Sequence, residues 1–125
     1  MKTTRRCPVK RSQNSSNLEV GTVAIQAAGM ALQLARRVPP PFRSIADQVV
    51  RSASSVPANL VEGNGREGRD RYHHWRIAYG SAQEVGCHLE LLVGAGVVDG
   101  ERATAALDLF DRVRAMTWRL LHPKP

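Results

Sequence analysis

The stretch SVPANLVEGNGR, residues 55–66, combines features that an uninterrupted helix rarely holds together. Pro57 lies inside a pattern that is otherwise typical of a helix, and Asn59 and Glu62 stand three residues apart among apolar side chains. The stretch then ends on Gly-Asn-Gly and Arg66. Three interpretations are open: a glycine-rich loop that cradles phosphate, a site built on a catalytic carboxylate, or a structural joint between helices.

The glycine-rich end of this stretch does not match the known phosphate-binding loops. EGNGREG, residues 62–68, lacks the P-loop spacing, and no strand pattern precedes it as a P-loop or a dinucleotide fingerprint requires. The residues therefore favour a two-glycine joint between antiparallel helices. A weaker anion-binding interpretation stays open, because glycine lets the backbone approach an anion and Arg66, Arg69 and Arg71 lie beside the start of the next helix.

Four segments of the chain repeat apolar residues at spacings of three and four, the pattern of amphipathic helices. No alternating strand-like run competes with them, and prolines and glycines separate them. Four helices with short joints predict an all-α fold, an antiparallel up-down-up-down four-helix bundle. The expected helices run from the capping box that starts at Ser16 to the prolines at 39–41, from Ser44 to Gly63 or Gly65, from between Glu67 and Asp70 to Gly94 or Gly96, and from the N-cap Asp99 to His122.

Pro57 and the polar residues after it fit the kinked end of a helix, where polar side chains need hydrogen-bond partners. Proline inside a helix removes one hydrogen bond, at about 3 kcal/mol in an ordinary helix, and the resulting kink lets the helix wrap around its neighbours. If the face that carries Asn59 and Glu62 is buried, both side chains need partners. The candidate partners are Arg66, Arg76 and a group from another subunit.

Composition separates a basic N-terminal segment from the rest of the chain. Of the 125 residues, residues 1–16 carry five basic side chains and no acidic one, whereas residues 17–125 have a net charge of +2. We expect residues 1–16 to be a disordered tail that attracts polyanions, and residues 17–125 to form the bundle domain.

The chain has no feature that points to a membrane or to secretion. No apolar run approaches the roughly 18 residues that span a bilayer, and the basic N-terminus lacks the apolar core of a signal peptide. Cys7 and Cys87 lie in unrelated contexts and form no disulfide framework. A cytoplasmic protein without a membrane role is therefore expected.

The residue types that carry chemistry do not assemble into a recognisable catalytic or metal motif. His73 and His74 are adjacent and point about 100° apart on a helix, so they cannot chelate one ion as neighbours. Glu84 and His88 share a helix face, which favours an ion pair, and no Glu-x-x-His pair of a di-metal bundle is present. Cys87 is expected to be a small packed side chain. We expect no cofactor, no metal and no enzymatic activity.

Two blocks of the sequence resemble a known family. QVVRSASSVPANLVEGNGR, residues 48–66, resembles the signature Q-I-x-R-A-x-x-S-I-P-x-N-I-A-E-G of the four-helix-bundle proteins encoded in intervening sequences of bacterial 23S ribosomal RNA genes. Residues 71–98 are similar to the next block of that family, F-x-x-I-A-x-G-S-x-x-E-x-x-x-x-L. The matching positions there are Ile77, Ala78, Gly80, Ser81 and Glu84, and the likeness covers about residues 18–121.

The resemblance implies a small cytosolic bundle that assembles as a homopentameric ring. In one branch, the accessory variability determinant of diversity-generating retroelements, a basic barrel binds nucleic acid and a reverse transcriptase, while most members have no established activity. A ring also suits the small and apolar residues on helices two and three, because small side chains allow close helix approach. These residues include Ala78, Gly80, Ser81 and Ala82.

Two functional hypotheses follow for this chain. The first is a non-enzymatic oligomer that binds RNA or DNA through arginines, and the alternative is a protein-interaction scaffold with no nucleic-acid role. The candidate nucleic-acid contacts are Arg51, Arg66, Arg69 and Arg71 in the bundle, with Arg5, Arg6, Lys10 and Arg11 in the tail. The residues expected to form a structural or interface motif are Pro57, Asn59, Glu62, Gly63, Gly80, Ser81 and Glu84.

Overall fold

The computed structural model describes residues 15–125, which form four long helices and one short 3-10 helix. The elements are α1 (Ser15–Ala35), η1 (Pro40–Phe42), α2 (Arg43–Asn64), α3 (Gly68–Gly94) and α4 (Gly100–Leu121). No strand occurs within residues 15–125, so the prediction of an all-α chain with four helices is confirmed. The tail residues Arg5, Arg6, Lys10 and Arg11 lie outside the described part of the chain.

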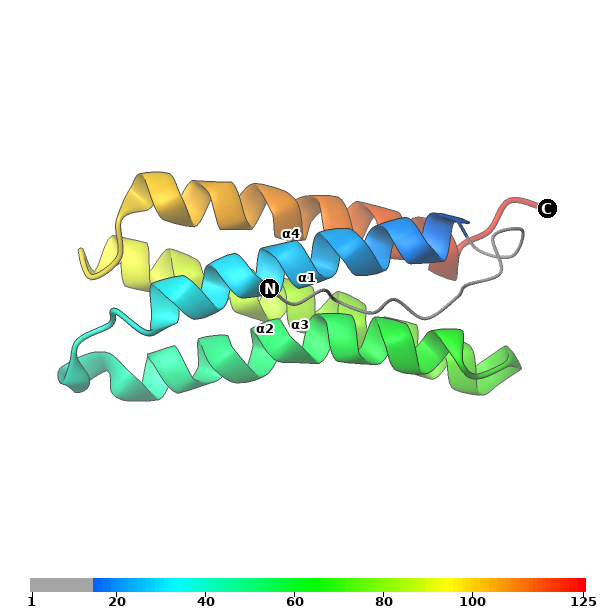
Figure 1. Cartoon of the computed structure of the whole chain (residues 1–125), viewed down its shortest axis with the longest axis horizontal. Helices are drawn as coiled ribbons and strands as arrows, with labels where there is room; N and C mark the ends of the chain where they lie inside the picture. The colour runs from blue at the N-terminus through cyan, green and yellow to red at the C-terminus, as the bar shows by residue number, and fades with distance from the viewer. Residues whose placement is uncertain (1–14) are drawn as a thin grey trace, which may run out of the picture.

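Each long helix packs against two others, so that the four enclose one core (Figure 1). α1 and α3 each contact both α2 and α4. The first turn of α1, the last turn of α4 and the α2–α3 joint lie at one end of the bundle, while the α1–α2 and α3–α4 connections lie at the other (Figure 1). None of the four described helices is both long and apolar enough to cross a membrane.

The core is built mainly from small side chains. Among the residues whose burial is described, those buried and apolar are eleven alanines, six valines and four leucines, together with Trp75 and Phe110. Small side chains let the helices approach closely along most of their length. The two large aromatic residues therefore fill the parts of the interior that alanine and valine leave open.

The helix ends differ from the prediction at α1. Ser16 lies inside the helix, which already includes Ser15, and the helix ends at Ala35 although the apolar pattern continues to Val38. The backbone bonds tighten there, because Val38 N–H donates to the carbonyl three residues earlier rather than four. Pro39 explains this, since the residue before a proline avoids the helical conformation. The predicted N-cap of α4 is confirmed, because the Asp99 carboxylate accepts a hydrogen bond from Arg102 N.

The predicted stop of the second helix at Gly63 or Gly65 is confirmed for Gly65, the C-cap of α2. Gly63 lies inside α2, and Gly65 at its C-cap has an ordinary negative φ of −86°. The left-handed residue of the joint is Gly68, with a φ of 58°, at the first position of α3. Gly63 is instead needed for close packing, because a Cβ atom there would lie 2.6 Å from the indole of Trp75.

Candidate nucleic-acid interface

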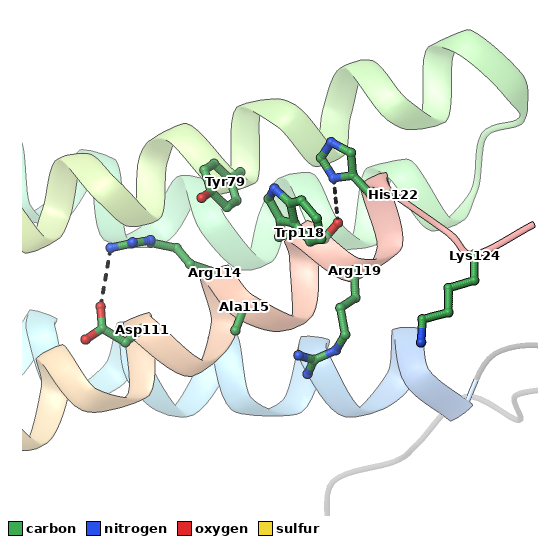
Figure 2. A pocket seen from close by; sticks show the side chains of 8 residues that line it. All are labelled: Tyr79, Asp111, Arg114, Ala115, Trp118, Arg119, His122 and Lys124. Carbon is green, nitrogen blue, oxygen red and sulfur yellow. Dashed lines mark hydrogen bonds and ion pairs between the residues drawn. The ribbon is translucent and has the colours of Figure 1, made fainter.

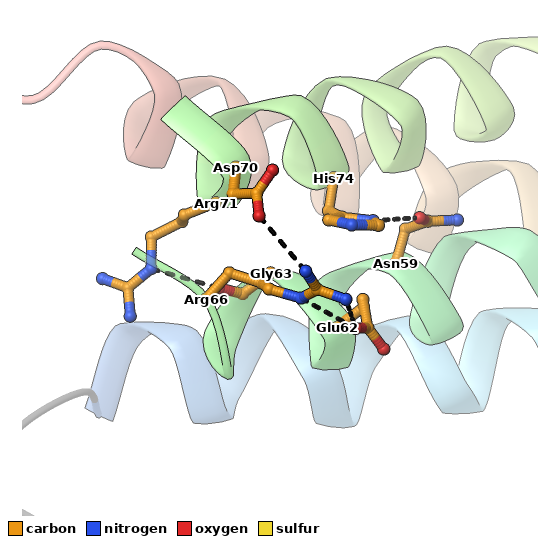
Figure 3. Close-up of polar contacts among 7 residues, drawn as sticks. All are labelled: Asn59, Glu62, Gly63, Arg66, Asp70, Arg71 and His74. Atoms are coloured by element: carbon orange, nitrogen blue, oxygen red, sulfur yellow. Dashed lines mark hydrogen bonds and ion pairs between the residues drawn. The ribbon is translucent and has the colours of Figure 1, made fainter. Parts of the chain in front are cut away.

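A line of polar side chains connects α2 and α3 beside the core. Asn59 Oδ1 lies 2.9 Å from His74 Nδ1, while the Asn59 amide nitrogen donates to Ser55 O at 2.9 Å (Figure 3). Ser81, on α3, donates its hydroxyl to Ser55 Oγ at 2.8 Å. Asn59 therefore finds its partner in His74, which the sequence had raised only as a metal ligand, rather than in Arg66 or Arg76.

Arg66 holds the α2–α3 joint through two carboxylates. Its guanidinium donates to Glu62 Oε2 at 2.7 Å and to Asp70 Oδ2 at 3.1 Å (Figure 3). The hydrogen bond and the charge of Glu62, followed by those of Asp70, raise the pKa of Arg66 above its ordinary value. The predicted pairing of Glu62 with Arg66 is confirmed, and the charge of Arg66 is already balanced within the chain.

Arg71 is used to close the end of α2. Its Nε donates to Gly63 O at 3.1 Å and its Nη2 to Asn64 O at 3.2 Å. The last carbonyls of a helix carry partial negative charge, so a guanidinium is a favourable partner for them. The same guanidinium lies 5.3 Å from the ring centroid of Trp75, within cation–π range.

The joint as a whole is close to electrically neutral. Its three arginines are accompanied by three carboxylates, those of Glu62, Glu67 and Asp70. Arg51 and Arg69 are exposed, and their guanidinium groups make no hydrogen bond or ion pair with another described residue. The structure thus leaves Arg51 and Arg69 available for a ligand and engages Arg66 and Arg71 internally, and the nucleic-acid role of all four stays a prediction.

A more basic site lies on the outward face of α4, which the sequence reasoning missed. A hollow of about 670 Å³ there includes one residue of α3, Tyr79 (Figure 2). Its charged groups are three permanent cations and one carboxylate. The lining residues are Tyr79, Asp111, Arg114, Ala115, Trp118, Arg119, His122 and Lys124. We call this hollow the α4 groove.

One side of the α4 groove is aromatic. Figure 2 shows Tyr79, Trp118 and His122 on the side of α4 that faces α3. The Trp118 side chain is 49% exposed, and the His122 ring stacks on it at a centroid distance of 4.0 Å and an interplanar angle of 23°. His122 Nδ1 also lies 2.9 Å from Trp118 O, which fixes the imidazole in place.

The cations of the α4 groove fall into two groups. Arg114 lies over the Tyr79 ring, 5.9 Å from its centroid, and its Nη1 is 3.3 Å from Asp111 Oδ1. Arg119 and Lys124 point to the opposite side of α4, toward α1, and have no ion-pair partner among the described residues (Figure 2). Their two charges are therefore open to an anion.

A signal for this groove was present in the sequence. The core positions of the last helix include Phe110, Val113 and Thr117, and all three are buried. A tryptophan directly after Thr117 cannot share that buried face, and four residues later His122 shares the face of Trp118. A large aromatic residue on the solvent side of an amphipathic helix indicates a binding surface.

Other expected features have mixed outcomes. Glu84 Oε2 lies 3.5 Å from His88 Nε2, at ion-pair distance when the histidine is protonated. No three His, Cys, Asp or Glu side chains gather as a possible metal site within residues 15–125. The expectation that Cys87 is packed is wrong, because its side chain is exposed on α3. Of the small residues proposed for a ring contact, Ala78, Ser81 and Ala82 face the bundle interior and only Gly80 is exposed.

The geometry defines a small four-helix-bundle protein with a basic and aromatic groove on its last helix. Residues 16–119 match the model of the 23S rRNA-intervening sequence protein family, and the chain belongs to this family. It is similar in fold to a protein of unknown function from the S23 ribosomal protein family of Bacteroides thetaiotaomicron. That likeness has a TM-score of 0.78 at 19% identity and covers 85% of this chain and 97% of the other. A comparison with curated proteins gives no match.

Proposed function

We propose that this chain is a non-enzymatic, oligomeric, up-down-up-down bundle protein of the cytoplasm that binds nucleic acid. The observation that supports the proposal is the α4 groove, where three cations face one carboxylate beside an exposed indole. Cations that neutralise phosphates release counterions, and this gives affinity without sequence readout. The description of the family refers to intervening sequences of 23S rRNA, which suggests an RNA context.

The proposal assigns different weights to the arginines. Arg119 and Lys124 are the principal phosphate contacts, since neither is paired within the described chain. Arg51 and Arg69 are further exposed cations outside the groove, whereas Arg66 and Arg71 act in the α2–α3 joint. The basic residues of the N-terminal segment add non-specific attraction, because clustered positive charge draws polyanions from any direction.

The test compares two double variants of the full chain. Arg119→Ala/Lys124→Ala is expected to weaken binding of a labelled structured RNA about tenfold, and to make the slope of log affinity against log salt shallower by about 1–2. The matched control is Arg36→Ala/Arg37→Ala, which removes two exposed arginines from the opposite end of the bundle. Fluorescence anisotropy over a salt series measures both quantities.

Two outcomes of that experiment would count against the proposal. If the unaltered chain binds neither RNA nor DNA at low salt, the protein-interaction scaffold becomes the better account. If instead a variant without Arg5, Arg6, Lys10 and Arg11 loses all binding while Arg119→Ala/Lys124→Ala loses none, the attraction is the charge of the N-terminal segment alone.

The oligomeric part of the proposal rests on the outward face of α1. Residues 20–35 contain no charged side chain, and a helix that is uncharged all round normally has partners on every side. Ile25 is 62% exposed on this face, together with Leu32, and a Cβ atom added at Gly21 or Gly29 would meet nothing within 4 Å. We propose that α1 supplies the subunit contact of a closed ring, a pentamer as the family resemblance implies.

Ile25→Glu is expected to convert the oligomer into folded monomers. The carboxylate would have to lose its hydration inside an apolar contact, which is costly without a partner. The matched control is Val61→Glu, because Val61 on α2 is also 62% exposed but lies outside the α1 face. Light scattering after size exclusion should give the 13.7 kDa chain mass for the first variant and the oligomer mass for the second. A monomeric unaltered protein would contradict the ring.

A further inference from the structure

We infer that the α4 groove takes an unpaired nucleobase together with its phosphate, so that the protein binds single-stranded nucleic acid in preference to duplex. The inference rests on the proposed nucleic-acid function and specifies the class of ligand. It depends on the aromatic side of the groove, because binding of phosphate by the cations alone would not need aromatic side chains.

The exposed indole is the first reason. Trp118 stays 49% exposed although the His122 ring stacks on one face of its indole, so the two rings already form a stack that a further flat group can join. In a duplex the faces of the bases are covered by their neighbours, so an aromatic side chain on the protein surface has nothing to stack on. An unpaired base offers a free face, and stacking on an aromatic side chain strengthens binding by tenfold or more.

The separation of charges in the groove is the second reason. The aromatic rings lie on the α3 side of α4, and Arg119 and Lys124 lie on the α1 side (Figure 2). A nucleotide has the same division, with a flat base at one end and an anionic phosphate at the other. A base on Trp118 would therefore leave its phosphate near two cations that have no ion-pair partner among the described residues.

The carboxylate of Asp111 gives the groove a direction. The carboxylate would repel a phosphate, and it lies about two helical turns from Trp118, at the end of the groove marked by Tyr79 and Arg114. Arg114 partly offsets this charge and also covers the Tyr79 ring. The phosphates of a bound strand are thus favoured at the Arg119 end of the groove.

A second copy of the chain is a weaker occupant for this surface. In a closed ring the groove would face a different surface of the next copy, and the ring contact proposed above uses the face of α1. Residues 20–35 of α1 carry no charged side chain, so that face offers no carboxylate to the three cations among the eight lining residues. Charge complementarity therefore assigns the α4 groove to a polyanion.

The experiment measures anisotropy of a labelled oligouridylate of twelve residues, the duplex of the same length, and uridine monophosphate as a competitor, all with the full chain. Trp118→Ala is expected to weaken single-strand binding tenfold or more and to change duplex binding less than twofold. Trp118→Phe, which keeps an aromatic ring, should restore most of the lost affinity. Phe42→Ala removes a partly exposed aromatic residue outside the groove and should change neither single-strand binding nor duplex binding.

The possible failures are distinguishable. If the duplex binds as tightly as the single strand, or if Trp118→Ala weakens both equally, the inference is overturned while the proposed function stands. If uridine monophosphate displaces the labelled oligouridylate at a concentration similar to that of the oligonucleotide, the inference is also overturned, because the site would then bind a free nucleotide as tightly as a strand. Dissociation of the oligomer by Trp118→Ala would place the indole in a subunit contact instead. Absence of binding to all three probes would remove the proposed function itself.

Discussion

Phe110→Ala is expected to lower the free energy of unfolding by about 3–5 kcal/mol, among the largest effects that a single core substitution produces. Phe110 is 1% exposed and belongs to a core in which alanine and valine predominate. Short side chains cannot swing into a vacated space, and helices already in close contact cannot move much nearer. Most of the volume of the lost ring should therefore remain as a cavity, which is what makes such substitutions costly.

Urea unfolding followed by circular dichroism, at one fixed protein concentration, measures this loss. The matched control is Phe42→Ala, since Phe42 lies in η1 and is 36% exposed. Phe42→Ala should lower the free energy of unfolding by well under half as much, because part of the Phe42 ring is already in water in the folded state. Equal losses of unfolding free energy for the two variants would show that the interior collapses into the cavity, contrary to the expectation that an alanine-rich core cannot.

Gly63→Ala is expected to destabilise the protein by about 1–3 kcal/mol, even though alanine is the better helix former. The added Cβ would lie 2.6 Å from Trp75 Cδ1 and Nε1 and 3.2 Å from Arg71 O. Trp75 is a rigid, buried ring and the third atom belongs to the backbone, so neither can give way cheaply. Relief requires α2 and α3 to separate at the joint, which would also loosen the Arg71 hydrogen bonds to Gly63 and Asn64.

Gly80→Ala provides the control, because it makes the same chemical change on α3. A Cβ at Gly80 meets nothing within 4 Å, so only the gain in helix propensity remains, and stability should rise by about 0.5–1 kcal/mol. The difference between the two variants then isolates the steric conflict with Trp75. A Gly63→Ala protein as stable as Gly80→Ala would rule out this close approach of α2 and α3.

The number and type of the helices could be predicted from the sequence because their signals are local. Apolar residues at spacings of three and four mark each helix, and Asp99 caps the last one through a bond within a single turn. The end of α1 was harder, since the apolar pattern continues past Ala35 while Pro39 already restricts the backbone before it. Local rules conflicted there, and the backbone restriction prevailed.

The candidate site was predicted less well because it depends on contacts between helices. Arg71 looks like a free cation in the sequence, yet it folds back on the end of α2. The partner of Asn59, His74, lies fifteen residues away on the next helix. Tyr79 and Trp118 line one groove only because α3 and α4 pack side by side. The spacing of Trp118 and His122 marks only the α4 side of the groove, and the contacts between helices leave no periodic pattern in the sequence.

The placement of the helix ends decides how the molecule can be handled. The first turn of α1 and the last turn of α4 lie at the same end of the bundle, and Trp118 and Lys124 lie at that end of α4 (Figures 1 and 2). A fluorophore or an affinity tag attached at the C-terminus, next to Lys124, would thus crowd the α4 groove. The connections at 36–42 and 95–99 lie at the far end. A dye or a surface tether attached there would leave the groove facing the solution.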